Sequence, residues 1–545
     1  MPIRIPNEWK KQVLSDFGGL AIVPKDSMES LTLTNTEVLM DGSLKSFQGT
    51  TNISSTDLGS GHAIIGVGTG VTGLTSQLTT LVWSDDSVGG PKVYSSVSFG
   101  TDTEGPYGFT DITGAASLNA SAEYVSFAQG VDAAGTPIIL FCNQSNGVWK
   151  YDGSGDIEQI VAAPATAILV TTYQGYTVAV VNPNELHFSE RHDPDTWPVT
   201  QVIELTSEMG PIRGLASLPD KLLLFFKEGI STIYGRTFDE ISGAGGIVRQ
   251  SASIGCNFPI SISMCNNEIG LMTVDGPVIL DPSGIQADYI SEPIREVFIE
   301  WSNTGSSSGA VSQYQYKGLL TPFHYIISRI DQTLSNSTET YIFQRQKRMW
   351  WKFIAPDDMQ PTAWCNRGEN FLTQSKGTYP AVDVDGNLQT GHYAGLYYNV
   401  PPNYGVMYGA NDGRLHVMNF ALFNSQDPNI NSVSTWADES TAVTSTWRSK
   451  WIDFGSQGLQ KQIRKIQIDA WGKVVSIIIH YIDRDGSEQS IGNAYSQLRG
   501  TGGLPINSPG GWNPRTTIRA ISIELIGSDL DIRSIAMTWK GKRIG

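Results

Sequence analysis

The stretch TVAVVNPNELHFSE, residues 177–190, places two runs of apolar and β-branched residues on either side of an Asn-Pro-Asn turn. A turn of this composition between two such runs predicts a β-hairpin. The same pattern recurs with different residues at 139–152, 222–235, 269–281, 340–353 and 405–419. The chain therefore repeats a hairpin unit.

The spacing of these units indicates the fold. Successive turns lie about 40 to 50 residues apart in the first four units and nearer 70 in the last two, and about 40 to 50 residues is typical of a four-stranded propeller blade. A ring of such sheets buries the faces that each would expose alone. We therefore predict an all-β protein whose residues 21–423 form an irregular six- or seven-bladed β-propeller, with room for an early blade within 30–85. Insertions are also predicted, at about 84–130 and 286–340.

Two short helices are predicted outside this pattern. Residues 7–17, within an N-terminal arm over 1–20, place four apolar side chains on one helical face: Trp9, Val13, Leu14 and Phe17. Residues 291–301 begin with Ser291 as a cap and then place apolar residues at helical spacing: Ile294, Val297, Phe298 and Trp301. Both helices are expected to pack against the body, and the N-terminal one could instead dock on a partner.

The last hundred residues predict a separate domain. Residues 424–445 are polar and typical of a linker. Beyond them lie five segments, most of which alternate polar and apolar residues: 446–455, 462–472, 474–483, 516–527 and 531–541. This alternation predicts a C-terminal β-domain over 446–545 that resembles a β-sandwich.

The sequence contains no apolar run near the roughly 18 residues of a membrane span, and MPIRIPNEWKKQVLSDF lacks the apolar stretch of a signal peptide. We therefore expect a soluble protein made in the cytosol. Cys142, Cys256, Cys265 and Cys365 are scattered, so neither a disulfide framework nor a zinc knuckle is indicated. Buried free thiols are expected.

The net charge of −16 is unevenly distributed. Residues 441–545 carry 14 Lys and Arg against 8 Asp and Glu, which is +6, whereas residues 1–440 carry 23 against 45, which is −22. An acidic body repels nucleic-acid phosphates and disfavours a DNA-binding protein. It still suits a surface that DNA slides past.

Three short motifs resemble ligand sites. GTGVTG (68–73) matches the glycines of a dinucleotide loop, but Thr- and Val-rich residues follow it where that fingerprint needs a helix. DVDGN (383–387) and DRDGSE (483–488) resemble fragments of calcium loops, but neither completes an EF-hand, and Asp-Gly is typical of hairpin turns. We predict no cofactor and no metal at these positions.

Residues 187–197 hold five groups that could bind a metal or act as acid and base: His187, Glu190, His192, Asp193 and Asp195. Proline after Asp193 ends a strand, aspartate side chains cap turns, and Trp197 can fold back as an apolar plug. We favour this corner over a metal site and assign no catalytic, cofactor-binding or metal-ligating residue. Because H-E-x-x-H and Walker motifs are missing from the sequence, an enzyme is not expected.

The run LHFSERHDPDTWP (186–198), followed by VIELTSEMGPIRGLASLPDKLLLFFKEGISTIYG (202–235), resembles the signature of tail nozzle proteins of short-tailed bacteriophages, also called tail tubular protein B or the DNA-stabilisation hub. In that family an Asp-Pro…Trp corner precedes a Gly-x-Ile-x-Gly-Leu segment, here Gly210, Ile212, Gly214 and Leu215, and a hairpin ending in Ile-Tyr-Gly. NTEVLMDGSLKSFQGT (35–50) and residues 446–545 are similar to the family's early strand-turn-strand and C-terminal β-domain. Residues 84–130 and 286–340 match nothing in it.

The resemblance implies a structural virion protein without enzymatic activity or cofactor. Such proteins form a ring, usually of six copies, below the portal and adaptor proteins. Double-stranded DNA passes through the lumen, and the outside or tip holds fibres or a needle or plug. The expected location is the virion tail, assembled in the host cytoplasm, with the basic domain 441–545 contacting acidic neighbours.

Two alternatives remain open from the sequence. A propeller that binds or cleaves glycans would need a carboxylate pair or an exposed aromatic shelf, for which the candidates are Trp350, Trp351, Tyr397 and Tyr398. Alternation of these side chains between blade faces is expected instead. A DNA-binding protein would show salt-sensitive affinity concentrated in 441–545.

Overall fold

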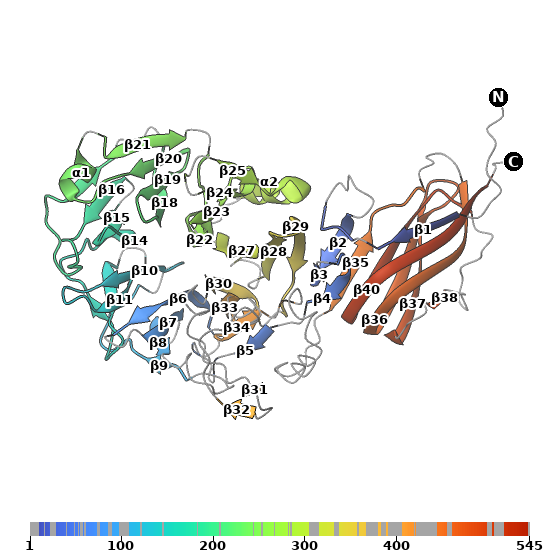
Figure 1. Ribbon diagram of the computed structural model, residues 1–545, viewed down its shortest axis with the longest axis horizontal. Helices are drawn as coiled ribbons and strands as arrows, with labels where there is room; N and C mark the ends of the chain where they lie inside the picture. The colour runs from blue at the N-terminus through green and yellow to red at the C-terminus, as the bar shows by residue number, and fades with distance from the viewer. Residues whose placement is uncertain are drawn as a thin grey trace.

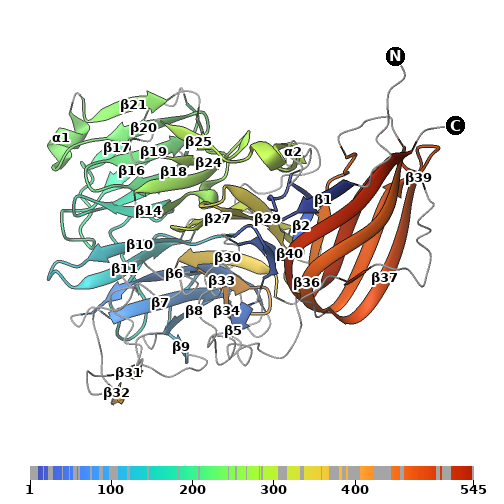
Figure 2. The same ribbon diagram turned by 45° about the vertical axis from the view of Figure 1, so that its right-hand side comes forward.

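The structure, a computed structural model, describes the chain between residues 10 and 542 with gaps. The gaps of five residues or more are 22–28, 85–89, 97–107, 305–315, 332–336, 367–379, 383–387, 391–405, 421–443, 455–459, 499–503 and 506–516, and shorter gaps of one to three residues lie elsewhere. The described residues form a β-propeller joined to an elongated C-terminal β-domain (Figures 1 and 2). No helix among them is long and apolar enough to cross a membrane.

In the described part of the chain, six propeller blades are separate four-stranded antiparallel sheets. Five of them take their strands in chain order: β6 (Ile64–Thr72), β7 (Gln77–Ser84), β8 (Lys92–Ser96) and β9 (Thr110–Asp111); β10 (Ser126–Val131), β11 (Pro137–Cys142), β12 (Val148–Tyr151) and β13 (Glu158–Gln159); β14 (Ala167–Tyr173), β15 (Tyr176–Val181), β16 (Glu185–Phe188) and β17 (Val202–Glu204); β18 (Ile212–Ser217), β19 (Leu222–Phe226), β20 (Gly229–Ile233) and β21 (Ile247–Ser251); and β22 (Ser263–Cys265), β23 (Glu268–Thr273), β24 (Gly276–Leu280) and β25 (Ala287–Tyr289). The first strands β6, β10, β14 and β18 contact one another in turn. These strands therefore lie innermost.

The rest of the ring includes a blade made from both ends of the propeller. β26 (Tyr316–Leu320), β27 (His324–Asp331), β28 (Ser337–Gln344) and β29 (Met349–Phe353) form a four-stranded unit between β22 and β30. The last blade joins β30 (Pro361–Asn366), β33 (Val406–Ala410) and β34 (Leu415–Met418) to the N-terminal strand β5 (Thr50–Asn52), and it contacts β6. The predicted six- or seven-bladed propeller is confirmed: six blades are sheets of their own, and β26–β29 take a seventh position within a larger sheet.

All six predicted hairpins are present: β11–β12, β15–β16, β19–β20, β23–β24, β28–β29 and β33–β34. The stretch 177–190 forms β15 and β16, and Val181 pairs with Glu185 across its turn. Val178 and Val180 are buried on one face of the blade and Ala179 on the other. Both faces are apolar because each blade packs between two neighbours.

The predicted insertions are wrong within the described residues. Residues 84–130 supply β8, β9 and β10, and residues 286–340 supply β25 to β28. These ranges therefore contribute blade strands. Strands of two or three residues, such as β9 and β25, carry too little alternation to be recognised from sequence.

The two helix predictions have different outcomes. Residues 10–14 form a strand, β1 (Lys10–Leu14), which pairs antiparallel with β40 (Ala520–Lys542), so the helix predicted over 7–17 is wrong there. Val13 is 42% exposed, because in a strand it faces away from its buried neighbour Leu14. Backbone pairing with a long strand has overridden the helical spacing.

The helix predicted over 291–301 is confirmed. It comprises η2 (Glu292–Ile294) and α2 (Arg295–Thr304), and Ile294, Phe298 and Trp301 are buried. Ser291 precedes the helix but makes no capping bond with its side chain. Two further short helices lie in the described part of the propeller, α1 (Phe238–Ser242) and η1 (Pro259–Ser261).

The C-terminal domain is built on two strands of 23 residues each, β36 (Gln460–Ile482) and β40, which pair antiparallel along their length. Each strand joins two of the predicted segments, so the predicted breaks near residues 473 and 529 are wrong. Register shifts, such as the one between Asp469 and Ala470, bend the pair without ending it. Apolar residues from both halves, including Ile466 and Ile477, share one core, which accounts for the sandwich-like fold.

Shorter strands flank this pair: β35 (Ser445–Ser449), β37 (Glu488–Leu498), β38 (Leu504–Pro505) and β39 (Thr517–Ile518). The predicted linker 424–445 lies outside the described residues up to position 443. A small hairpin of β31 (Pro380–Val382) and β32 (Leu388–Thr390) stands apart from the blades in Figure 1.

N-terminal strands join the two parts of the molecule. β2 (Ser30–Thr34) lies between β29 of the propeller and β35, and β4 (Leu44–Ser46), the partner of β3 (Thr36–Val38), pairs with β40. The seventh blade and the C-terminal domain consequently belong to one fourteen-stranded sheet. This corrects the predicted division into an arm over 1–20 and a body over 21–423, because the described strands before residue 47 belong to the C-terminal sheet.

Candidate functional site

Two glycines of 68–73 serve packing between blades. Gly68 and Gly70 lie in the inner strand β6. A Cβ atom added at Gly68 would lie 2.9 Å or less from three atoms of the Phe127 ring, and one at Gly70 would lie 2.8 Å from Ile139 Cγ1. The first two blades approach closely because these side chains are missing, which explains the pattern without a phosphate ligand.

Residues 189–198 form the predicted corner. Asp193 Oδ1 accepts a hydrogen bond from the backbone N–H of Asp195 at 3.1 Å, and Trp197 Nε1 donates to the Pro194 carbonyl at 2.7 Å. His192 has a positive φ of 59°. The corner prediction is confirmed by these bonds.

The charged side chains of the corner bind different partners and do not converge on one site. Asp195 pairs with Lys150 Nζ of the preceding blade at 2.8 Å, and His187 Nε2 lies 3.3 Å from Glu185. Across the described ranges, no three His, Cys, Asp or Glu side chains gather as metal ligands would. The segment therefore serves to connect blades.

The structure describes one of the two Asp-Gly motifs. In DRDGSE, Asp483 Oδ1 accepts from the N–H groups of Asp485 and Ser487, both at 2.9 Å, and Gly486 has a φ of 92°. This is the predicted turn, and it connects β36 with β37. Residues 383–387 lie outside the described residues, although the flanking strands β31 and β32 pair.

Trp350 and Trp351 form no exposed shelf. Trp350 packs 5.4 Å from the Phe298 ring and donates through Nε1 to the Ile290 carbonyl at 2.6 Å. Trp351 is buried on the opposite face, in the core shared with the C-terminal domain. The predicted alternation is confirmed for these two, whereas positions 397 and 398 lie outside the described residues.

None of the four cysteines forms a disulfide, and all four are buried, as predicted. Burial raises the pKa of Cys256 to about 12 and that of Cys365 to about 11. Both thiols are therefore protonated at neutral pH and poorly nucleophilic.

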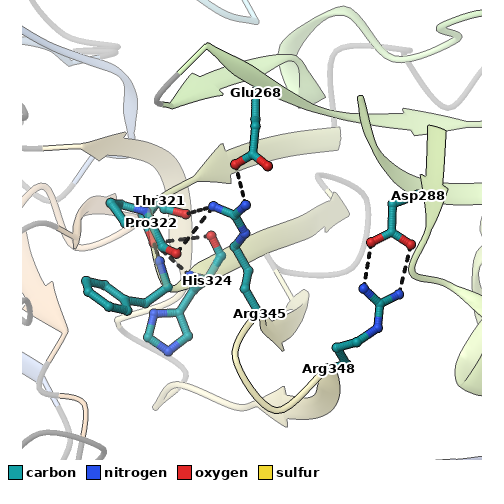
Figure 3. Close-up of polar contacts among 8 residues, drawn as sticks. Glu268, Asp288, Thr321, Pro322, His324, Arg345 and Arg348 are labelled. Carbon is teal, nitrogen blue, oxygen red and sulfur yellow. Dashed lines mark hydrogen bonds and ion pairs between the residues drawn. The ribbon is translucent and has the colours of Figure 1, made fainter. Parts of the chain in front are cut away.

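An arginine clamp, defined as Arg345 and Arg348, joins the β28–β29 turn to the neighbouring blade (Figure 3). Arg345 donates to the Thr321 carbonyl at 3.0 Å and forms an ion pair with Glu268 of β23. Arg348 forms two parallel bonds with Asp288 of β25, at 2.7 and 2.8 Å, and these bonds lower the pKa of that carboxyl group. The clamp fixes the blade β26–β29 against its neighbour in the ring, the blade β22–β25.

Asn35 connects the propeller to the C-terminal domain. Its Nδ2 donates to the carbonyls of Ile354 at 3.0 Å and Thr444 at 3.1 Å, and its Oδ1 accepts from the Ile354 N–H at 2.8 Å. Ser445 Oγ donates to the Asn35 carbonyl at 2.6 Å. The residue is buried and has a φ of 48°, a conformation that asparagine tolerates well. One side chain thus ties the ends of β2, β29 and β35 together.

Lys317 links blades that are not neighbours in the ring. It lies in the inner strand β26, is 4% exposed, and donates through Nζ to the carbonyl of Glu123, just before β10, at 2.9 Å. Burial lowers its pKa to about 7. The clamp, Asn35 and Lys317 each hold two parts of the scaffold together.

Comparisons with known proteins do not assign the chain to a family. No protein-family model matches the chain, and neither does any curated protein. Among solved structures, Sqt1 of Saccharomyces cerevisiae is similar at 10% identity and a TM-score of 0.36, over 68% of this chain and 99% of that one. BamB of Moraxella catarrhalis is similar at 12% identity and a TM-score of 0.31, over 68% and 98%. The propeller assignment stands on the sheet topology described above.

Proposed function

We propose that this protein is a structural subunit of the tail of a short-tailed bacteriophage. In this role it is a nozzle protein that forms an oligomeric ring below the portal and adaptor, has no enzymatic activity, and carries fibres or a plug. The observation that carries the proposal is the fourteen-stranded sheet shared by the seventh blade and the C-terminal domain. The wall of a conduit must keep its domains in place while DNA moves past, and a shared sheet locked by Asn35 resists rotation between them.

Two sequence features support the same role. Residues 180–235 resemble the nozzle family, and they form blade hairpins and the Asp-Pro corner. The net charge of −22 over residues 1–440 suits a surface that repels DNA phosphates, and the net charge of +6 over 441–545 suits contacts with acidic neighbouring subunits. A glycan-binding propeller is not proposed, because Trp350 and Trp351 are buried.

The test is the assembly state of the full chain. Light scattering and negative-stain electron microscopy are expected to show a ring, either from the protein alone or after addition of a purified adaptor ring. A matched preparation in high salt should show weaker assembly if the two charged regions contact each other. A protein that stays monomeric and also fails to bind the adaptor would contradict the proposal.

A further inference from the structure

One face of the seventh blade carries buried polar groups that the described protein atoms do not satisfy. Gln344, the last residue of β28, is 2% exposed, and neither its Oε1 nor its Nε2 has a hydrogen-bond partner among the described residues. Trp351 of β29 is 1% exposed, and its Nε1–H has no acceptor within the part of the chain that the structure describes. An amide and an indole N–H are therefore buried without partners in one sheet.

The strand register brings these groups together. Gln344 lies opposite Met349, and Ile342 lies opposite Trp351. Gln344 and Trp351 are therefore diagonal neighbours on the same face, within reach of each other's long side chains. On its other side Gln344 lies directly opposite His324 of β27. The polar groups thus form one cluster, which we call the Gln344 cluster.

Aromatic rings surround the Gln344 cluster. The His324 ring stacks on Phe420 with centroids 4.1 Å apart and an angle of 16°, and Phe420 lies 6.4 Å from Trp351. Phe47 lies 5.5 Å from Trp351 and 5.9 Å from Phe420. Burial lowers the pKa of His324 to about 3, so the imidazole is neutral at physiological pH, with one donor and one acceptor nitrogen.

The chemistry of the cluster selects its ligand. Folded proteins satisfy buried polar groups through protein atoms or ordered water, because an unpartnered group is costly to bury. The Gln344 amide offers both donors and an acceptor, and the Trp351 indole offers a donor. Water can both donate and accept, so it can bind the amide and the indole together. An anion would leave the Gln344 carbonyl oxygen without a donor, and a metal ion would find only that one oxygen as a ligand. We propose that ordered water binds here and bridges the Gln344 amide to the Trp351 indole.

The site lies at a junction of segments. Leu20 N–H donates to the Trp350 carbonyl at 2.8 Å, and Gly19 packs so closely on Met349 that an added Cβ atom would lie 2.7 Å from its Cβ. The N-terminal segment therefore covers the same end of the blade. Bound water would therefore lie within the contact between the N-terminal segment and the blade. This conclusion does not depend on the proposed role in a virion.

The first test compares two buried glutamines. Gln360 is 6% exposed, its Nε2 donates to the carbonyls of Ala355 and Pro356, and its Oε1 accepts from the Thr338 N–H. If water satisfies Gln344, both Gln344→Met and Gln360→Met should lower Tm by about 2 °C or more. If Gln344→Met leaves Tm unchanged or raises it while Gln360→Met lowers it, the amide is dry and the proposal is overturned.

The second test is direct and needs no variant. An experimental map of the full chain at about 2 Å resolution should show water within hydrogen-bonding distance, about 2.7 to 3.2 Å, of the Gln344 amide and of Trp351 Nε1. A clear map that shows no density beside the amide would overturn the proposal even if Gln344→Met fails to fold. Trp351→Phe, which removes one N–H only, should then weaken the water peak.

Discussion

The propeller and the C-terminal domain are both built from strands, but they differ in how far apart along the chain the paired strands lie. In the propeller most strands pair with the next strand in sequence, as β15 does with β16. In the C-terminal domain β40 pairs with β1, β4, β35 and β36, which come from both ends of the chain. The first arrangement can be recognised in a short window of sequence, whereas the second cannot.

This difference also predicts how far the destabilising effect of a mutation extends through the molecule. A blade hairpin closes a short loop, whereas the pairing of an N-terminal strand with β40 closes a very long one and depends on a large shared core. A change at the junction is therefore expected to destabilise both parts of the molecule. A change inside one blade is expected to remain local.

The largest effect is expected at the junction. Asn35→Ala should lower the free energy of unfolding by about 3 kcal/mol, because it removes three side-chain hydrogen bonds that each contribute about 1 kcal/mol at the junction. Denaturant unfolding followed by tryptophan fluorescence measures the loss. The control is Asn146→Ala, which removes one side-chain bond to Ser117 and should cost about 1 kcal/mol. Equal losses in the free energy of unfolding for the two variants would show that Asn35 stabilises the protein no more than an exposed side chain does.

The next effect is expected inside the propeller. Gly68→Ala should cost about 2 kcal/mol, because its Cβ atom would overlap the Phe127 ring and force the first two blades apart. Gly108→Ala is the control, since nothing lies within 4 Å of an added Cβ there. Hydrogen exchange should speed up in β6 and β10 and stay unchanged in β36. Faster exchange in β36 would contradict the local character of the blades.

The third prediction concerns pH. The pKa of Lys317 is about 7 in the folded protein because of burial, and near 10.5 when unfolded. Between these values the unfolded chain binds the proton more readily, so Lys317 destabilises the fold below pH 7, and this penalty fades as pH rises toward 10.5. Wild-type stability relative to Lys317→Met should therefore increase by about 1 kcal/mol per pH unit between pH 8 and 10. Parallel pH profiles of the two proteins would rule this out.

The smallest effect is expected at the exposed half of the clamp. Arg348 and Asp288 are both about half exposed, so Arg348→Ala should cost less than about 1 kcal/mol, and the loss should shrink at high salt. Arg345→Met should cost more, because Arg345 is less exposed and also binds the Thr321 carbonyl. Unfolding measured at two salt concentrations decides the order. A reversed order would mean that bidentate geometry outweighs burial here.

Local chemistry explains what was predictable from sequence. The hairpins, the Asp-Pro corner and the Asp483 turn depend on residues a few positions apart, and all three are present. β1 was misread because Val13, Leu14 and Phe17 fit helical spacing, and only pairing with β40 makes them a strand. The segments 462–472 and 474–483 were predicted as separate strands, but β36 runs through both.

The main polar contacts could not be predicted, because their partners are distant in sequence. Asn35 lies 319 positions from Ile354 and 409 from Thr444. Arg345 and Arg348 occupy a turn that was recognised, but Glu268 and Asp288 lie 77 and 60 positions away. The one local signal at Asn35 is a polar, turn-forming residue between two short runs of alternating Thr and apolar residues.

The strand β5 has a consequence for synthesis of the protein. Thr50 pairs with Met418, which follows it by 368 positions, so the first propeller strand to leave the ribosome finds its partner only when that position emerges. At about 5 to 20 residues per second the wait is roughly 20 to 75 seconds. The ring is expected to close after translation of nearly all its blades, and a ribosome stalled before residue 415 should leave β5 open to protease.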